Sequence, residues 1–163
     1  MSIPAQDYHR THIVIPEKLY EGPDTLVNNL VGKRVSKPGV LRHTTRSPVL
    51  VCHPDDVEWF SDDRIFPGLK RITGDGSGYG SSLVLVPHDS LPPGVAVLDS
   101  PDIDSVAEAD RTLATKLLAA ADLWLFVTTA ARYADAVPWE FLGQARQRST
   151  AMALVLIRVP AGP

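Results

Sequence analysis

Six short apolar runs, each the length of a β-strand, recur along the chain and limit the folds that it can adopt. They are HIVI (12–15), SPVLVCH (47–53), SLVLVPH (82–88), GVAVLDS (94–100), DLWLFVTT (122–129) and TAMALVLIRV (150–159). The run 122–129 is continuously apolar from Leu123 to Val127, which is typical of a strand covered on both faces. Segments with helical spacing lie between the runs. This alternation predicts an α/β domain with a mostly parallel sheet flanked by helices.

Four helices are predicted between these strands, at residues 25–32, 57–60, 106–121 and 138–149. Asp24 suits the N-cap of the first helix, and Gly32 suits its end. Pro138 stands at the first position of the last helix, where proline is favourable. The third helix has one apolar face, formed by Val106, Ala109, Leu113, Leu117 and Ala121.

The strands at 82–88 and 94–100 are joined by a short turn, so we expect them to form one antiparallel edge in the sheet. Residues 54–81 form a long connection within a single domain that spans residues 1–163. The domain is long enough to bury a sizeable core.

Composition narrows the possible environments and partners of the chain. The net charge of −3 argues against a nucleic-acid partner. Cys52 is the only cysteine, which excludes an intrachain disulfide and favours a reducing compartment. The N-terminus carries no signal-peptide pattern, and no apolar run approaches the roughly 20 residues needed to span a bilayer. We therefore expect a cytoplasmic protein without a transmembrane segment.

The run 94–100 leads directly into three carboxylates, Asp99, Asp102 and Asp104. In open α/β sheets ligands bind beyond the carboxyl ends of the strands, and magnesium needs only one or two carboxylates because it keeps several waters. The alternative is structural, since Asp102, Asp104 or Ser105 can cap the helix that follows. Asp99 comes too early to cap that helix, and for this residue the metal and structural interpretations both stand.

The order of these segments resembles that of bacterial dynamin-like GTPases of the P-loop class. LRHTTRSPVLV (41–51) looks like the first switch, with Thr45, Arg46 and Pro48 matching its pattern. GVAVLDSPDIDSV looks like the strand and second switch, in which Asp99 and Pro101 match. TLVNNLVG (25–32) resembles the helix after the phosphate loop. The resemblance covers roughly residues 12–160. It implies a three-layer P-loop sandwich that binds GTP with Mg²⁺, the metal being held by Thr45 and Asp99. For Thr45 the alternative is a turn hydroxyl.

The phosphate loop itself departs from the family pattern GxxxxGK[ST]. Alignment on TLVNNL places Gly22 on the second glycine, Pro23 on the lysine and Asp24 on the hydroxyl residue. The resemblance still assigns nucleotide binding to Gly22, Pro23, Asp24 and Thr25. However, Pro23 removes a positive charge and an amide donor, and Asp24 adds a negative charge where phosphate should bind. Glu17 replaces the first glycine.

The other end of the chain also departs from the family. Where the base-reading motif [NT]KxD is expected, the chain reads Ile157, Arg158, Val159 and Pro160. By this resemblance we expect the last strand and helix of a G domain to be missing. We therefore expect a G domain that is incomplete at its C-terminus, with weak or absent GTP hydrolysis. No catalytic residue can be named. The alternatives are a pseudo-GTPase that binds a protein partner or itself, and a truncated fragment from a disrupted reading frame.

Overall fold

The computed structural model describes residues 10–16, 29, 31–32, 47–63, 65–73, 82–100, 108–129 and 136–157. Its strands are β1 (Arg10–Pro16), β2 (Val49–Cys52), β3 (Lys70–Thr73), β4 (Ser82–Pro87), β5 (Val95–Asp99), β6 (Leu123–Thr129) and β7 (Ala151–Ile157). Its helices are the 3-10 helix η1 (Pro54–Asp56) and the α-helices α2 (Val57–Ser61), α3 (Glu108–Ala119) and α4 (Ala136–Gln147). Residues 29 and 31 are also helical. Every predicted apolar run contains a strand, and the mixed α/β class is confirmed.

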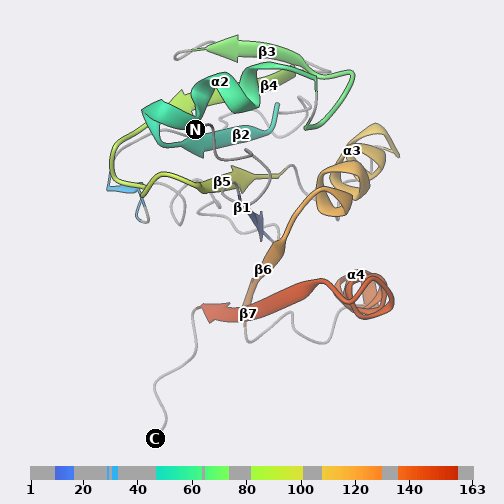
Figure 1. Cartoon of the computed structure of the whole chain (residues 1–163). Coiled ribbons are helices and arrows are strands. Elements are labelled where there is room, and N and C mark those ends of the chain that lie inside the picture. Colours follow the sequence, from blue (N-terminus) through green and yellow to red (C-terminus); the bar gives the residue numbers. More distant parts are fainter. Residues whose placement is uncertain are drawn as a thin grey trace, which may run out of the picture.

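The described strands form one sheet in the order β3-β4-β2-β5-β1-β6-β7 (Figure 1). Neighbouring strands are parallel except for β2 and β5, which are antiparallel. The sheet is therefore mostly parallel, as predicted. Strand β1 lies where the chain order reverses, with β2 to β5 on one side of it and β6 and β7 on the other.

The predicted antiparallel edge pair is wrong. Strands β4 and β5 are not neighbours, because β2 lies between them, parallel to β4 and antiparallel to β5. The single antiparallel step therefore falls inside the sheet. The turn between β4 and β5 must span two strand spacings, roughly 10 Å, and Gly94, with φ of 86°, allows the chain to re-enter the sheet.

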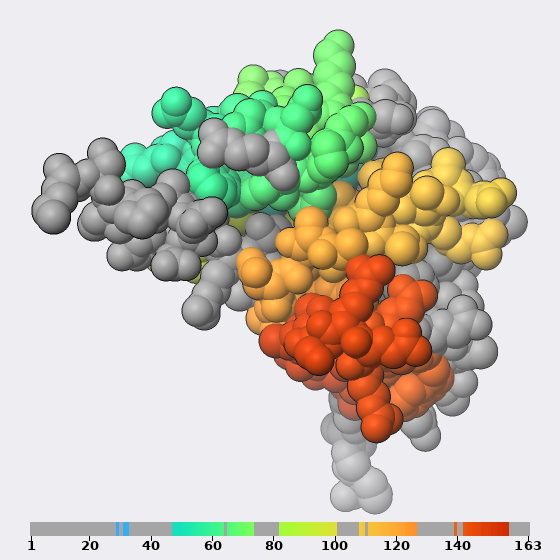
Figure 2. All heavy atoms as spheres, turned by 45° about the vertical axis from the view of Figure 1, so that its right-hand side comes forward, coloured from blue at the N-terminus to red at the C-terminus, as the bar shows by residue number. Residues whose placement is uncertain are grey.

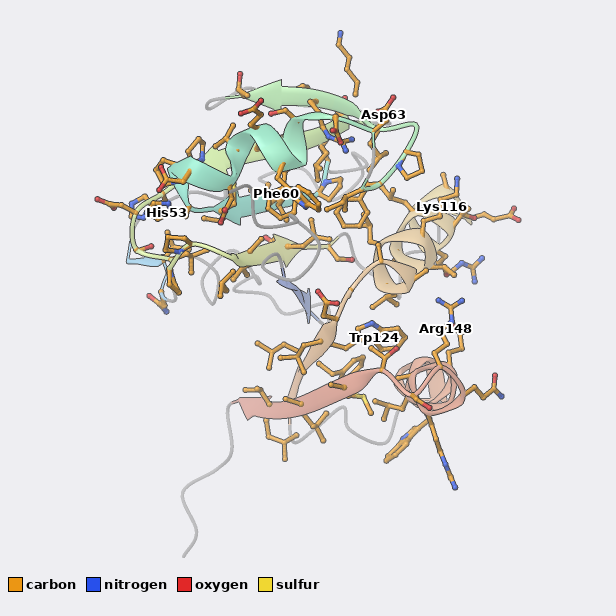
Figure 3. All side chains as sticks on the ribbon, viewed as in Figure 1. His53, Phe60, Asp63, Lys116, Trp124 and Arg148 are labelled. Carbon is orange, nitrogen blue, oxygen red and sulfur yellow. The ribbon has the colours of Figure 1, made fainter. Side chains whose placement is uncertain are left out.

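One face of the sheet carries the larger apolar core. The buried side chains of β2, β4, β5 and β6 on this face pack with Phe60 of α2, Leu117 and Leu118 of α3, and Ala145 of α4. Figure 2 shows α3 and α4 next to each other on this side of the molecule, and Figure 3 shows Trp124 of β6 near both helices. The Trp124 indole donates a hydrogen bond to the Leu118 carbonyl at 2.9 Å, which ties α3 to β6.

The opposite face carries a second apolar cluster, formed by Val31, Val51, Leu91 and Val97. Val31 is 2% exposed and helical, so a helical residue from the segment before β2 covers this face. The predicted end of that helix is confirmed, because Gly32 follows with a left-handed φ of 72°. Helical residues therefore pack against both faces of the sheet.

Two helices differ from prediction in detail. Helix α3 buries Ala114, Leu117 and Leu118, whereas Ala109, which was placed on its apolar face, is exposed. Helix α4 begins at Ala136, so Pro138 is its third residue rather than its first. Pro138 still lies within the first turn, where a backbone N–H has no helical partner to lose.

The connection after β2 is more ordered than predicted. Helix α2 forms where expected, but strand β3, which joins the sheet beside β4, was not foreseen. The Arg71 guanidinium of β3 donates hydrogen bonds to the backbone carbonyls of Phe60, Asp62, Ile65, Phe66 and Leu69. Burial lowers the pKa of Arg71, against the opposing effect of the Asp63 and Asp62 charges. This single side chain holds the connection between α2 and β3.

None of the described helices combines the length and apolar character that crossing a bilayer requires.

Candidate functional site

Three segments of the chain enter or leave the sheet beside the end of β5. Asp99, the last residue of β5, is aligned with Val14 of β1 on one side and with Val49 of β2 on the other. Strand β1 is parallel to β5 and ends at Pro16, whereas β2 is antiparallel and begins at Val49. The segments after β1, before β2 and after β5 therefore start from one end of the sheet. We call the place marked by Pro16, Val49 and Asp99 the Asp99 end.

The Asp99 end is the position in this topology where a ligand site is expected. Ligands of open α/β sheets bind beyond the carboxyl ends of the strands, at the point where the chain order reverses. Here that point is β1, and Asp99 stands on the neighbouring strand. The prediction that Asp99 lies at a strand tip in such a position is confirmed.

Asp99 and the next residue, Ser100, are both buried, at 7% and 4% exposure. A carboxylate is removed from water only where other groups offset the cost, and both residues have interaction partners. Side chains alternate along a strand, so Asp99 points to the same face as Val97. Val97 packs with Val31. The buried carboxylate and the helical residue that precedes Gly32 therefore lie on one face of the sheet.

Ser47 adds a hydroxyl group that the sequence prediction missed. It lies two residues before Val49, the residue aligned with Asp99. Its Oγ atom is buried and has no hydrogen-bond partner in the part of the chain that the structure describes. A buried unpaired hydroxyl is unusual, and a bound water or ion is one explanation for it. The only sequence signal was its position in the segment TTRSP, where Thr45 drew attention instead.

The other predicted site residues lie outside the described residues. These are the nucleotide-binding residues Gly22, Pro23, Asp24 and Thr25 and the metal ligand Thr45. Of the two predicted metal ligands, Thr45 and Asp99, the described part of the chain contains Asp99 alone. The helix that the phosphate loop was expected to precede is represented by Asn29 and Val31.

The donors at the Asp99 end fit magnesium rather than a softer metal. A carboxylate and a hydroxyl are hard oxygen donors, and magnesium binds through one or two carboxylates while keeping waters and substrate oxygens. Across the described ranges, from residue 10 to residue 157 with their gaps, no three His, Cys, Asp or Glu side chains cluster as a metal site.

Polar groups at the opposite strand ends are used inside the protein. We call this place the histidine end, because His53 follows β2 and His88 follows β4 (Figure 3 labels His53). The His53 Nδ1 atom accepts a hydrogen bond from the Asp55 amide at 3.2 Å. The His88 Nδ1 atom accepts one from the Ser90 amide at 3.1 Å. Both imidazoles thus serve local turns, and the histidine end is not a candidate site.

The structure defines a mixed α/β domain with a mostly parallel sheet, and the Asp99 end is its candidate ligand position. No protein-family model matches the sequence, and no curated protein matches it. Among solved structures, the fold is similar to a chain of an oligomerised bacterial dynamin pair, a structure described as providing a mechanism for the long-range sensing and tethering of membranes. The TM-score is 0.53 at 13% sequence identity.

The similarity extends over 92% of this chain but only 25% of that dynamin chain. The chain thus spans about a quarter of the length of its structural neighbour. At this identity the comparison shows the fold alone: the domain has a dynamin-like α/β fold.

Proposed function

We propose that the chain is a P-loop, GTPase-like domain whose Asp99 end binds guanine nucleotide with Mg²⁺, weakly and with little or no hydrolysis. The observation that carries the proposal is the meeting of three segments at the Asp99 end, where β1 leaves the sheet, β2 enters it and β5 ends in a buried carboxylate. The dynamin-like fold supports the same class of ligand.

The chain's own residues have distinct roles in this proposal. Asp99, with Thr45 from the segment before β2, would hold Mg²⁺, whose charge offsets that of the phosphates when it is bound. The backbone amides after Gly22, at the start of the helix that includes Val31, would bind phosphate oxygens. The Ser47 hydroxyl would reach a water or a phosphate oxygen, which would supply the partner that its Oγ atom lacks.

The weakness of binding follows from the residues that replace the usual phosphate loop. Pro23 supplies neither a charge nor an amide donor, and Asp24 repels phosphate. Two like charges about 4 Å apart cost roughly 1 kcal/mol in water and about 4 kcal/mol at an effective dielectric of 20. We expect a dissociation constant above about 100 µM, a binding free energy weaker than about −5.5 kcal/mol.

Titration with a fluorescent GTP analogue, in magnesium and then in EDTA, tests the proposal. The expected result is saturable binding that magnesium strengthens and that unlabelled GTP displaces. Binding that is equally strong in EDTA, or no saturation at millimolar nucleotide, contradicts it. A melting curve by circular dichroism on the same sample shows that the protein tested is folded.

A pseudo-GTPase interaction module is the second candidate, favoured by the lost lysine at Pro23 and the lost base-reading aspartate near Arg158. In that case the melting curve remains cooperative while nucleotide fails to bind and fails to raise the melting temperature. A non-cooperative melt would instead indicate the third alternative, a fragment that does not fold.

A further inference from the structure

Two neighbouring strands of the sheet end in the same way, with a histidine that leads into a turn. Strand β2 continues into His53 and η1, and β4 continues into His88 and a turn. The two strands are parallel, and their last residues, Cys52 and Pro87, are aligned. The His88 amide donates a hydrogen bond to the Cys52 carbonyl at 2.8 Å. The two histidines therefore follow aligned residues on neighbouring strands at the histidine end.

Each imidazole closes its turn by accepting the backbone amide two residues later. His53 is the N-cap of η1, and its Nδ1 atom accepts a hydrogen bond from the Asp55 amide at 3.2 Å. The His88 Nδ1 atom accepts one from the Ser90 amide at 3.1 Å and lies 2.7 Å from the Ser90 hydroxyl oxygen. A ring nitrogen that accepts a hydrogen bond carries no proton, so both neutral rings hold their proton on Nε2.

Histidine makes such a cap dependent on pH. Ser, Thr, Asp and Asn are the residues preferred at N-caps, whereas histidine is the side chain whose charge ordinarily changes between about pH 5 and about pH 8. Protonation of a neutral ring adds a proton to Nδ1, because Nε2 already carries one. The charged ring can then only donate hydrogen bonds. The amides of Asp55 and Ser90 lose their acceptors at that moment.

We propose that His53 and His88 form a pair of acid-sensitive caps, which release the Asp55 and Ser90 amides when the rings become charged. Each charged ring has a carboxylate close by as its new acceptor. The His53 Nδ1 atom lies 3.5 Å from Oδ2 of Asp55, and the His88 Nδ1 atom lies 3.7 Å from Oδ1 of Asp89. Each Nδ1 atom thus exchanges an amide donor for a carboxylate acceptor, and both turns change with pH.

Three other titratable groups are described close to these histidines in the chain. The Asp56 carboxylate accepts a hydrogen bond from the Gly94 amide at 2.7 Å, and Glu58 is exposed on α2. The Cys52 thiol is fully buried, and burial together with the Asp56 charge raises its pKa to about 11. The thiol therefore stays neutral from neutral to mildly acidic pH. We assign the response in this range to the two histidines.

NMR spectra of the isotope-labelled full chain, recorded from about pH 8 to about pH 5, test the proposal. At the start of the titration the imidazole nitrogen resonances should show a bare Nδ1 and a protonated Nε2 in both rings. On acidification the amide proton resonances of Asp55 and Ser90 should move upfield, because each amide loses its hydrogen bond. Each amide should have the same midpoint as the histidine that caps it.

The variants His53→Asn and His88→Asn are matched controls for each other. Asparagine keeps a side-chain acceptor that suits a cap but has no titrating charge. His53→Asn should hold the Asp55 amide resonance constant over this pH range and leave the Ser90 response intact, and His88→Asn should do the reverse. His53→Ala, which has no side-chain acceptor, should hold the Asp55 amide resonance near its acidic position throughout.

Three outcomes overturn the proposal. They are a proton on Nδ1 at about pH 8, amide resonances that do not follow the histidine midpoints, and an Asp55 response that survives in His53→Asn. The caps lie at the other end of β2 from the Asp99 end and need no nucleotide. These results therefore leave the proposed function untouched, and failure of nucleotide binding leaves the caps untouched.

Discussion

The connection after β2 and the Asp99 end of the sheet differ in how their polar groups are used. In the connection, Arg71 donates to five backbone carbonyls, and the Asp56 carboxylate accepts a hydrogen bond from the Gly94 amide at 2.7 Å. At the Asp99 end, a buried carboxylate lies near the start of β2, where the Ser47 hydroxyl has no partner among the described residues.

This difference indicates that the polar groups of the connection stabilise the fold, whereas the Asp99 end has a polar group available to a ligand. Polar groups that are satisfied inside the protein stabilise the fold, and their loss leaves buried partners unpaired. A buried group without a partner costs stability, and for Ser47 a ligand that supplies the partner would remove this cost. We therefore expect substitutions of the satisfied groups in the connection to change stability, whereas substitution of Ser47 at the Asp99 end should change binding with little effect on stability.

Arg71→Met should have the largest effect. It leaves the carbonyls of the connection without their donor, at a cost of about 3 kcal/mol, which lowers the melting temperature by about 10 °C. Lys70→Met, at the exposed neighbouring position, should change the melting temperature by less than about 2 °C. Thermal melts by circular dichroism measure both. Equal effects of the two variants would show that the Arg71 hydrogen bonds do not stabilise the connection.

Restoring the phosphate loop should have the largest effect on binding. Glu17→Gly, Pro23→Lys and Asp24→Ser together recreate GxxxxGKS and should tighten a fluorescent GTP analogue about 100-fold, equivalent to roughly 2.7 kcal/mol. Affinity should rise because Asp24→Ser removes the repulsion between a carboxylate and the phosphates. Pro23→Lys adds a positive charge and a backbone amide donor. Glu17→Gly alone serves as the control and should give little change. If the triple variant binds no better than wild type, the alignment of this loop is wrong.

Asp56→Ala should destabilise the protein without affecting nucleotide binding. The carboxylate is 5% exposed, and its loss leaves the half-buried Gly94 amide unpaired, at a cost of about 2 kcal/mol. Asp56→Asn keeps an acceptor oxygen and should recover most of this loss. Melting curves and the nucleotide titration, run on the same samples, separate the two effects. If nucleotide affinity falls by more than the loss of folded protein explains, Asp56 takes part in binding and does not act through stability alone.

Ser47→Ala should have the smallest effect on stability. Because the hydroxyl has no partner among the described residues, its removal should shift the free energy of unfolding by less than about 0.5 kcal/mol or stabilise the fold. Chemical denaturation measures this change. A loss of 1 kcal/mol or more would mean that the hydroxyl is satisfied within the protein. Nucleotide affinity should fall a fewfold.

Much of the fold could be predicted from the sequence because the strands are apolar and compact. Val49, Leu50 and Val51, for example, mark β2 without ambiguity. Strand β3 could not be predicted, since KRIT is short and charged, and its arginine bonds carbonyls of the preceding irregular segment, two to eleven residues before it. The antiparallel step was misplaced because a short turn indicates a hairpin, and only the register shows that β2 lies between β4 and β5.

The candidate site was predictable at Asp99, where an apolar strand runs straight into a carboxylate. Ser47 could not be identified in the same way, because an orphan hydroxyl is visible only once the packing around it is known. The position of β1 where the chain order reverses could not be predicted either, because it depends on the strand order of the sheet and not on the residues of β1.

The magnesium dependence of nucleotide affinity, compared between two carboxylates at opposite ends of the sheet, tests the central claim most directly. Asp99→Asn removes the charge at the Asp99 end, and Asp89→Asn removes an exposed charge beside His88 at the histidine end. We predict that magnesium tightens binding of a fluorescent GTP analogue about tenfold in wild type and Asp89→Asn, and has no effect in Asp99→Asn. If Asp99→Asn retains the full magnesium effect while folded, Asp99 does not hold the metal and the proposed site is wrong.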